Sequence, residues 1–228
     1  SQFKIPYVYG LTCGELALML NGERMLTGGV QCNLTVIKMK GWKRRMDYTA
    51  TGLQWIPSSP HIPHPHSAFF YPVSGILGEL GYMSIGVGYT IPFQMFAAPW
   101  AEADKLADAL NALHVPGVIF RPIYLKPFYS VGQGQQLQGV QVHITDYAHA
   151  PLSPLQFLVM QEVARLWPDR AVFDHADKGR FAMFDKVCGS RQIRERFTKT
   201  NRWEDIRPYW EKDVESFRRL SKKYYLYR

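Results

Sequence analysis

The chemically richest part of this 228-residue chain lies between residues 35 and 100, where polar and aromatic side chains stand among prolines and glycines. Lys40 and Trp42 suit an anionic group and a sugar ring, because an indole face matches the apolar C–H face of a pyranose. Prolines and glycines hold such side chains in place without regular secondary structure. The segment is therefore predicted to form the wall of a ligand site. The alternative is a snorkelling lysine and a half-buried core tryptophan.

Histidines form a second group of candidates. His143 shares the polar face of a predicted strand with Gln141, where it is expected to hydrogen-bond either a ligand or a neighbouring strand. His61, His64 and His66 alternate with prolines, and no cysteine or acidic residue lies in that run. Proline-rich backbone does not readily bring three imidazoles together, so we predict no metal site here. His61 is assigned instead to a loop that lines the site, and no cofactor is predicted.

Composition excludes several classes of protein. Hydrophobic residues make up 46% and charged residues 20% of the chain, an ordinary globular balance, and no apolar run approaches the roughly 20 residues of a membrane span. The net charge of +8 is densest at residues 43–45 and 218–223. The second cluster lies opposite Trp210, Val214 and Phe217 on a predicted helix, so a solvated face explains it. Without a nucleic-acid motif we predict no nucleic-acid partner, although a basic site for an anionic ligand agrees with the charge.

The N-terminus and the cysteines carry less information. The chain opens at Ser1 without a secretory signal, and its abrupt start predicts that an N-terminal segment has been removed. Cys13, Cys32 and Cys188 are widely spaced, so at least one thiol stays free in the monomer and no C-x-x-C metal pair exists. The redox compartment stays open. Cys13 is interpreted as a packing residue.

The elements that must position these residues are of mixed α and β type. Thr12 and Glu15 have the spacing of a capping box, which predicts a helix ending at Asn21-Gly22 and accounts for Glu15 without catalysis. Alternating hydrophobicity predicts strands at residues 34–39 and 139–145, and residues 118–123 are interpreted as another strand. Further helices are predicted over residues 102–113, from the N-cap Ser153 to 166, over 181–187 before Gly189, and from a first-turn Pro208 towards Tyr224.

Motifs along nearly the whole chain then indicate a family. They are GLTCGELA (10–17), VIKMKGWKR (36–44), WIPSSPHIP (55–63), APW (98–100), PGV (116–118), FRP (120–122), GVQVHITD (139–146) and YLY (225–227). In this order they resemble the bacterial exo-β-N-acetylmuramidases, formerly a domain of unknown function and now a glycoside hydrolase family.

The resemblance implies hydrolysis of β-1,4-linked N-acetylmuramic acid from the non-reducing ends of peptidoglycan fragments, in the periplasm or outside the cell. Members have a Rossmann-like N-terminal domain, whose Pro-Glu-His-Gly motif carries the catalytic glutamate, and a C-terminal domain that closes the cleft. This chain has no such motif. We therefore expect an α/β chain forming a single C-terminal domain over residues 1–228, with a helical subdomain at 151–228. Its partners are a peptidoglycan-derived amino sugar and the missing N-terminal domain.

One segment departs from the family pattern. Residues 79–93 read ELGYMSIGVGYTIPF, where the family has a run rich in acidic residues and arginines. Glu79, Ser84, Gly86, Gly88 and Thr90 are retained, whereas Ile85 replaces an acidic residue and Val87 and Ile91 replace arginines. An arginine is the natural partner of the lactyl carboxylate of muramic acid.

Glycosidases use a pair of carboxyl groups, and Glu79 is the best local candidate for one of them. The alternative is a structural carboxylate that accepts hydrogen bonds from loop amides. Tyr89, in the same segment, is predicted to bind substrate with Lys40, Trp42, His61 and His143. The rival function is a divergent, non-catalytic domain of the same fold that binds a glycan or another partner.

Overall fold

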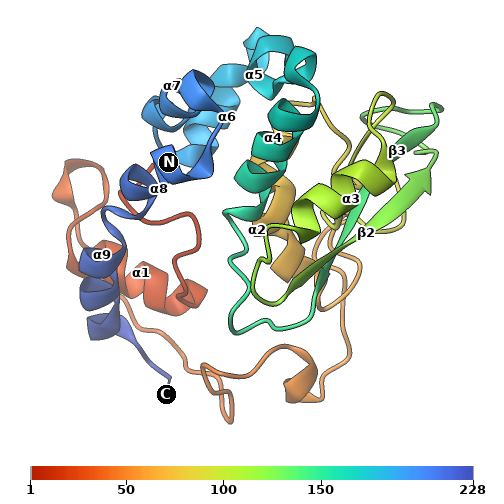
Figure 1. Ribbon diagram of the computed structural model, residues 1–228. Coiled ribbons are helices and arrows are strands. Elements are labelled where there is room, and N and C mark those ends of the chain that lie inside the picture. The colour runs from red at the N-terminus through yellow and green to blue at the C-terminus, as the bar shows by residue number, and fades with distance from the viewer. Residues whose placement is uncertain (1, 228) are drawn as a thin grey trace. The chain divides into compact units, whose positions relative to one another are not determined.

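The computed structural model describes residues 2–227, which fall into two compact units (Figure 1). The first unit holds the chain up to Trp55 together with the chain from Trp210 onward. The second unit is Ile56–Tyr209. The architecture is mixed helix and sheet, which agrees with the predicted α/β class. The predicted helical subdomain, residues 151–228, is divided between the units.

The first unit is built around two helices. They are α1 (Cys13–Gly22) and α9 (Val214–Ser221), with 3₁₀ turns at Thr27–Gly29, Thr49–Thr51 and Lys222–Tyr224. The capping box of α1 is confirmed, since the Glu15 amide donates to Thr12 Oγ1 at 3.3 Å and the Thr12 amide donates to Glu15 Oε2 at 2.9 Å. The predicted strand at 34–39 is wrong. Its alternation is real, but no described residue pairs with it, and Ile37 is 93% exposed.

The second unit contains a three-stranded antiparallel sheet. Its strands are β1 (Met95–Ala98), β2 (Val118–Leu125) and β3 (Leu137–Ile144), in the order β1-β3-β2. The predictions of β2 and β3 are confirmed. Sequence analysis missed β1, whose four residues are all buried and so lack alternation. In β3, a Cβ on Gly139 would lie 2.0 Å from the Phe96 carbonyl oxygen, so only glycine fits there.

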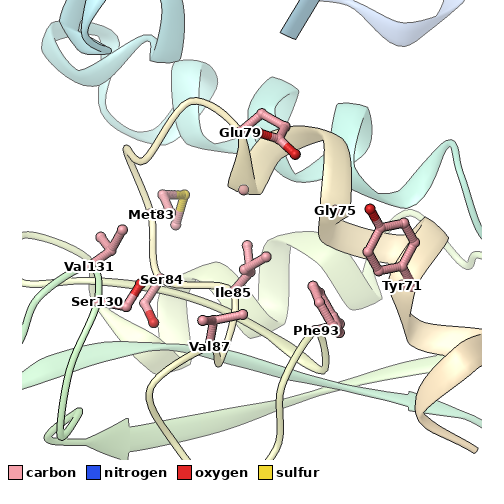
Figure 2. A pocket seen from close by; sticks show the side chains of 11 residues that line it. Tyr71, Gly75, Glu79, Met83, Ser84, Ile85, Val87, Phe93, Ser130 and Val131 are labelled. Atoms are coloured by element: carbon pink, nitrogen blue, oxygen red, sulfur yellow. The ribbon is translucent and has the colours of Figure 1, made fainter. Parts of the chain in front are cut away.

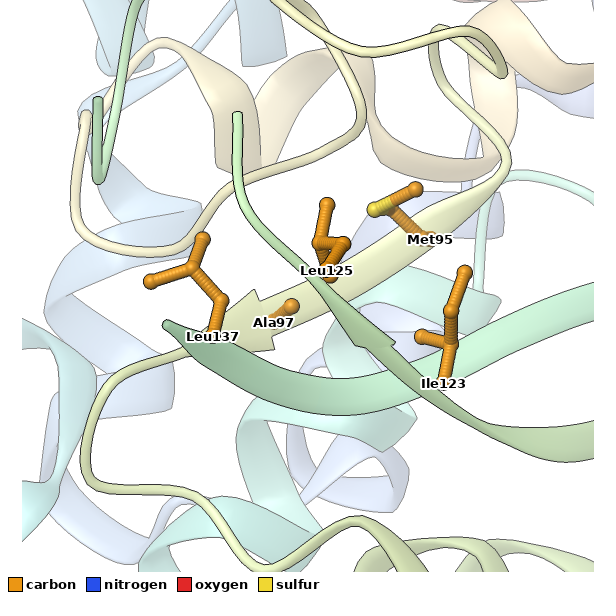
Figure 3. Close-up of a cluster of buried hydrophobic side chains, with 5 residues drawn as sticks. All are labelled: Met95, Ala97, Ile123, Leu125 and Leu137. Atoms are coloured by element: carbon orange, nitrogen blue, oxygen red, sulfur yellow. The ribbon is translucent and has the colours of Figure 1, made fainter. Parts of the chain in front are cut away.

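The two faces of this sheet are covered differently. Helix α3 (Ala103–Asn111) packs on β2 and β3, and the Asn111 side chain bonds both backbone groups of Phe120 (Figure 1). The other face carries the buried cluster of Met95, Ala97, Ile123, Leu125 and Leu137, shown in Figure 3. Tyr89 and Ile91 pack against this cluster. A loop thus covers the face that α3 leaves open.

The remaining helices of the second unit follow in chain order. They are α2 (Ser67–Gly78), α4 (Leu155–Leu166), α5 (Val172–His175), α6 (Phe181–Cys188), α7 (Arg191–Thr200) and α8 (Trp203–Glu211), which crosses the boundary of the units. The predicted helices α3, α4 and α6 are confirmed, and Gly189 ends α6 in the left-handed conformation. Within residues 2–227 no helix has the length and apolarity to cross a membrane.

Three details of the helix prediction are wrong. The N-cap of α4 is Pro154, without a side-chain hydrogen bond, and the predicted N-cap Ser153 lies one residue before it. Pro208 lies inside α8 and does not open the last helix, which is α9. Helix α2 was interpreted as part of a loop-rich wall because it contains Pro72 and two glycines, yet its buried face makes it helical.

Candidate functional site

A pocket of about 230 Å³ lies in the second unit where α2 ends (Figure 2). Three segments line it: the last two turns of α2, the loop before β1 and the loop between β2 and β3. The lining residues are Tyr71, Gly75, Gly78, Glu79, Met83, Ser84, Ile85, Val87, Phe93, Ser130 and Val131. The volume is below the 300–1,000 Å³ typical of drug-sized ligands and suits a single sugar ring.

Glu79 is the one charged residue among those that line the pocket. It directly follows α2, and its amide donates to the Ile76 carbonyl oxygen at 3.2 Å. Its side chain is half-buried and has no hydrogen-bond or ion-pair partner among residues 2–227. No loop amide among the described residues donates to this carboxylate, and its role stays a prediction. Figure 2 shows Glu79 on one side of the pocket, with Ile85, Val87 and Phe93 on the other.

Two lining residues adopt backbone conformations that are rare without glycine. Phe93 has φ +68° and Ser130 has φ +68°. Ser74, fully buried in α2, donates its hydroxyl to the Phe93 carbonyl oxygen at 2.9 Å and so holds that residue in place. The Phe93 ring meets the Tyr71 ring edge-on at 4.9 Å, which forms an aromatic wall. Strained residues of this kind cluster at ligand sites.

Close backbone contact locks the two loops of the pocket together. The Phe128 amide donates to the Gly88 carbonyl oxygen at 2.8 Å. Gly88 has φ +93°, and a Cβ there would lie 1.9 Å from the Tyr129 carbonyl oxygen. Only glycine therefore allows this approach, which gives a physical reason for a glycine in a segment whose polar residues differ from the family pattern.

The other predicted site residues of this unit do not line the pocket. His61 Nε2 lies 2.8 Å from the Tyr129 hydroxyl, next in sequence to the lining residue Ser130. Tyr89 packs against the sheet and stacks on Phe128 at 6.2 Å. His143 is exposed opposite Ile119 on β2. His61 is thus bonded to a pocket loop through its side chain, and Tyr89 belongs to the loop before β1.

Lys40 and Trp42 belong to the first unit. Lys40 is exposed, whereas Trp42 is half-buried and meets the Tyr227 ring edge-on at 4.8 Å. The Met39 amide donates to the Tyr227 hydroxyl at 3.1 Å. This packing agrees with the half-buried core tryptophan of the sequence analysis. The role of Lys40 stays a prediction.

Glu15 organises the first unit. Its buried carboxylate forms an ion pair with Arg44 and accepts the Leu226 amide at 2.7 Å. Arg44 also donates to the Gly10 carbonyl oxygen at 2.8 Å and lies 3.6 Å from the centre of the Tyr225 ring. Three of the sequence motifs, at 10–17, 36–44 and 225–227, thus meet at one carboxylate. These motifs are accounted for by structure.

The pKa of Glu15 reflects the balance of these contacts. Burial raises the pKa, but the hydrogen bonds from the Thr12 amide, Arg44 and the Leu226 amide outweigh it, so that the pKa lies below its ordinary value. The carboxylate therefore stays ionised at neutral pH. This is the behaviour of a structural ion pair and agrees with the capping role.

Histidine and cysteine are the remaining residue types that could bind a metal ion or act as a nucleophile. His66 stacks on Tyr147 at 6.1 Å, and His61 is bonded to Tyr129. Among residues 2–227 no group of three or more histidine, cysteine, aspartate or glutamate side chains is placed to hold a metal ion. Cys13 and Cys32 are exposed thiols. Burial raises the pKa of Cys188 far above its ordinary value, so that thiol stays protonated.

Family models match almost the whole chain. The model described as exo-beta-N-acetylmuramidase NamZ, C-terminal, matches residues 69–227, and its N-terminal counterpart matches residues 1–66. The chain belongs to the NamZ family. This confirms the resemblance seen in the sequence. The two models divide the chain between 66 and 69, whereas sequence analysis treats 1–228 as one C-terminal domain.

A curated NamZ relative, the peptidoglycan beta-N-acetylmuramidase NamZ of Bacillus subtilis (strain 168), is 35% identical over 225 residues, which are 99% of this chain and 52% of the relative. A crystal structure of a DUF1343 family protein from Bacteroides fragilis NCTC 9343 is 78% identical with a TM-score of 0.97, over 100% of this chain and 59% of that one. A second such protein from B. fragilis, 21% identical over 94% of this chain and 55% of that one with a TM-score of 0.63, shares the fold. This chain spans about half the length of its curated relative.

Sequence reasoning missed the third wall of the pocket. Ser130 and Val131 come from a loop with small and polar residues that matches no motif quoted from the sequence. The available signal was the glycine pair Gly132 and Gly134, both with positive φ, which marks a turn-rich loop. What faces Glu79 across the pocket is set by tertiary packing.

Proposed function

We propose that this chain is part of a cell-wall glycoside hydrolase of the NamZ family that removes N-acetylmuramic acid from the non-reducing ends of peptidoglycan fragments. The observation that carries the proposal is the carboxylate of Glu79, which has no partner among residues 2–227 and lies in a pocket the size of one sugar, beside the Tyr71–Phe93 wall. Aromatic walls and free carboxylates are the recurrent parts of sites that hold and cleave sugars. Because peptidoglycan lies outside the cytoplasm, the proposed location is periplasmic or secreted.

Glu79 supplies one of the two carboxyl groups that glycoside hydrolysis requires. Among the described residues it is the one carboxylate that lines the pocket. We place the second on a Rossmann-like N-terminal domain, to which residues 1–66 contribute. Exposed apolar side chains within residues 1–66 support this assignment, because such side chains are typical of a surface that another part of a protein covers. More than half of the surface is exposed for Val30, Ile37 and Leu53.

In this proposal Glu79 transfers a proton to or from the substrate, or it accepts hydrogen bonds from the sugar hydroxyls and so orients the ring. The Tyr71–Phe93 wall packs on the same ring. His61 fixes the loop that carries Ser130 through its hydrogen bond to Tyr129. Lys40 keeps its predicted role of binding an anionic group, within the first unit. Tyr89 and His143, which belong to the same unit as the pocket, support the substrate side less directly.

The second candidate function is a non-catalytic glycan-binding domain. It is favoured by the composition of the pocket, where Val87 lines a wall and one carboxylate is present. A domain of this kind binds sugar through hydroxyl and aromatic groups and needs no second carboxylate. Both functions use the same pocket, but only the hydrolase is expected to turn over its substrate.

The test is release of a chromophore from a β-N-acetylmuramic acid glycoside. The 228-residue chain is assayed beside a form that carries the Rossmann-like domain upstream, each also as Glu79→Gln. Turnover by the extended form, with a loss of at least about 100-fold in the Glu79→Gln variant, supports the enzyme and the role of Glu79. Asp108→Asn, which removes an exposed carboxylate of α3 in the same unit, is the matched control and is expected to retain turnover. A folded extended form without turnover favours the binding domain.

A further inference from the structure

The pocket at the end of α2 has a one-sided electrostatic character. Glu79 is its single charged lining residue, and Gly75 and Gly78 expose the last turn of α2 to it. The carbonyl end of a helix carries partial negative charge, and the last turn of α2 contains no basic residue to offset it. The described residues that line the pocket therefore bring one negative charge and no positive charge.

A nearby cation does not reverse this character. Arg180 donates from Nη1 to the Glu79 carbonyl oxygen at 3.3 Å. Its guanidinium lies against Gly81, where a Cβ would be 3.1 Å from Cζ, and it does not line the pocket. The guanidinium therefore binds main chain beside Glu79, at the carbonyl end of α2, and is not among the lining residues.

The rest of the lining suits an uncharged polar ring. Tyr71, Ser84 and Ser130 bring hydroxyl groups, which both donate and accept hydrogen bonds. Val87 and Val131 bring apolar surface of the size of a methyl group. Such a lining suits sugar hydroxyls, which hydrogen-bond the three hydroxyl groups and the Glu79 carboxylate, and an acetamido methyl group, which packs on the two valines.

Ile91 and Val87, the two positions at which the family has arginines, are placed differently. Ile91 packs on the buried cluster of the sheet and does not line the pocket, whereas Val87 does. A cation at Val87 would face the ligand directly. Val87 is therefore the position at which one side chain decides the charge that the pocket accepts.

We propose that this pocket is a subsite for an uncharged N-acetylhexosamine ring and that it rejects the lactyl carboxylate of muramic acid. The inference rests on the proposed function, because it assigns this pocket to the neutral N-acetylglucosamine next to the muramic acid. The muramic acid carboxylate is then recognised outside this pocket.

The test is ligand binding to the isotopically labelled 228-residue chain, followed by NMR shifts of the lining residues. The probes are methyl β-N-acetylglucosaminide, N-acetylmuramic acid and N-acetylmuramic acid with its lactyl group converted to the amide. The amide keeps the bulk of the lactyl group and removes its charge. We expect the glucosaminide to bind at least about tenfold more tightly than muramic acid at pH 7, with the amide between them, as like-charge repulsion predicts.

Variants locate the cause of the preference. Glu79→Gln is expected to reduce the difference in binding affinity between muramic acid and its amide. Val87→Arg is expected to reverse that difference, so that muramic acid binds more tightly than its amide. Ile119→Arg adds the same charge at an exposed position of β2 outside the pocket, and Asp108→Asn removes a charge from an exposed position of α3. Both variants are expected to leave the ratio of the affinities for muramic acid and its amide unchanged. If Val87→Arg fails to fold, Glu79→Gln still decides.

Two results overturn the inference: muramic acid binding as tightly as the glucosaminide, or no sugar shifting the lining residues at concentrations up to tens of millimolar. Failure of the proposed function looks different. An extended form without turnover, in a chain that still prefers the neutral sugar, refutes the hydrolase and leaves the subsite. Turnover without discrimination in the pocket refutes the subsite alone.

Discussion

Two glutamates, one in each unit, show how differently a carboxylate can be placed. Glu15 lies in the first turn of α1, where the helix dipole favours negative charge, and Thr12, Arg44 and Leu226 bind it. Glu79 follows the last turn of α2, where the dipole disfavours negative charge, and no described residue binds its carboxylate. The first arrangement stabilises the fold. The second is unfavourable for the fold, which is the usual mark of a ligand site.

The strongest challenge to this comparison is removal of Glu15. Glu15→Ala leaves Arg44 without its anion and leaves the Leu226 amide unpaired, so the free energy of unfolding of the first unit is expected to fall by about 3 kcal/mol. Denaturant unfolding followed by tryptophan fluorescence measures the loss. Glu215→Ala, which breaks an exposed ion pair with Arg218 on α9, is the control and should cost less than about 0.5 kcal/mol. Equal losses would show that Glu15 is no more structural than a surface residue.

The next largest effect concerns the pocket loops. Gly88→Ala places a Cβ against the Tyr129 carbonyl oxygen at a positive φ, and is expected to cost about 2 kcal/mol and to loosen the loop around Ser130. Gly134→Ala is the matched control, because Gly134 has φ +72° but no atom near its Cβ, so it should cost only about 1 kcal/mol.

Hydrogen exchange of the loop between β2 and β3 tests the same pair of variants. We expect faster exchange around residues 127–134 in Gly88→Ala and little change around Glu15. A protein in which Gly134→Ala is the more damaging change would refute the account of loop packing.

Much of the fold follows from local patterns. The capping box at Thr12, the alternation of β3 and the left-handed end of α6 at Gly189 are each set by neighbouring residues, and each is confirmed. Residues 34–39 show the limit of such reasoning. Alternation specifies that a segment suits a sheet, but a strand also needs a partner, and none of the described residues provides one.

The candidate site was harder to predict. The segment of Glu79 makes it a candidate, whereas its neighbours in the pocket, Ser130 and Val131, come from a loop about 50 residues later that carries no periodic signal. Trp42 carried a strong signal and packs instead on Tyr227. Residue type indicates what a side chain can do, whereas tertiary packing decides whether it reaches a ligand.

A smaller effect separates the two glutamates by pH. The folded-state pKa of Glu15 is lowered, so its contribution to stability is present above its ordinary pKa and is lost as the pH falls through the lowered folded value. The first unit is therefore expected to lose stability in acid, and Glu15→Ala should flatten that dependence. Urea midpoints between pH 7 and pH 3 measure it. An unchanged acid dependence in the variant would assign the effect to other carboxylates.

The smallest expected change in stability, and the sharpest test of the comparison, is Glu79→Gln. It removes a negative charge from the carbonyl end of α2 without breaking any hydrogen bond of the described residues, so the free energy of unfolding should stay the same or rise by about 0.3–0.5 kcal/mol. The rise should shrink at high salt, because the charge is half-exposed and screening weakens its interaction with the helix. Thermal unfolding at low and at high salt measures both. A loss of more than about 1 kcal/mol would mean that the fold depends on this carboxylate, and Glu79 would then belong with Glu15 among the structural residues.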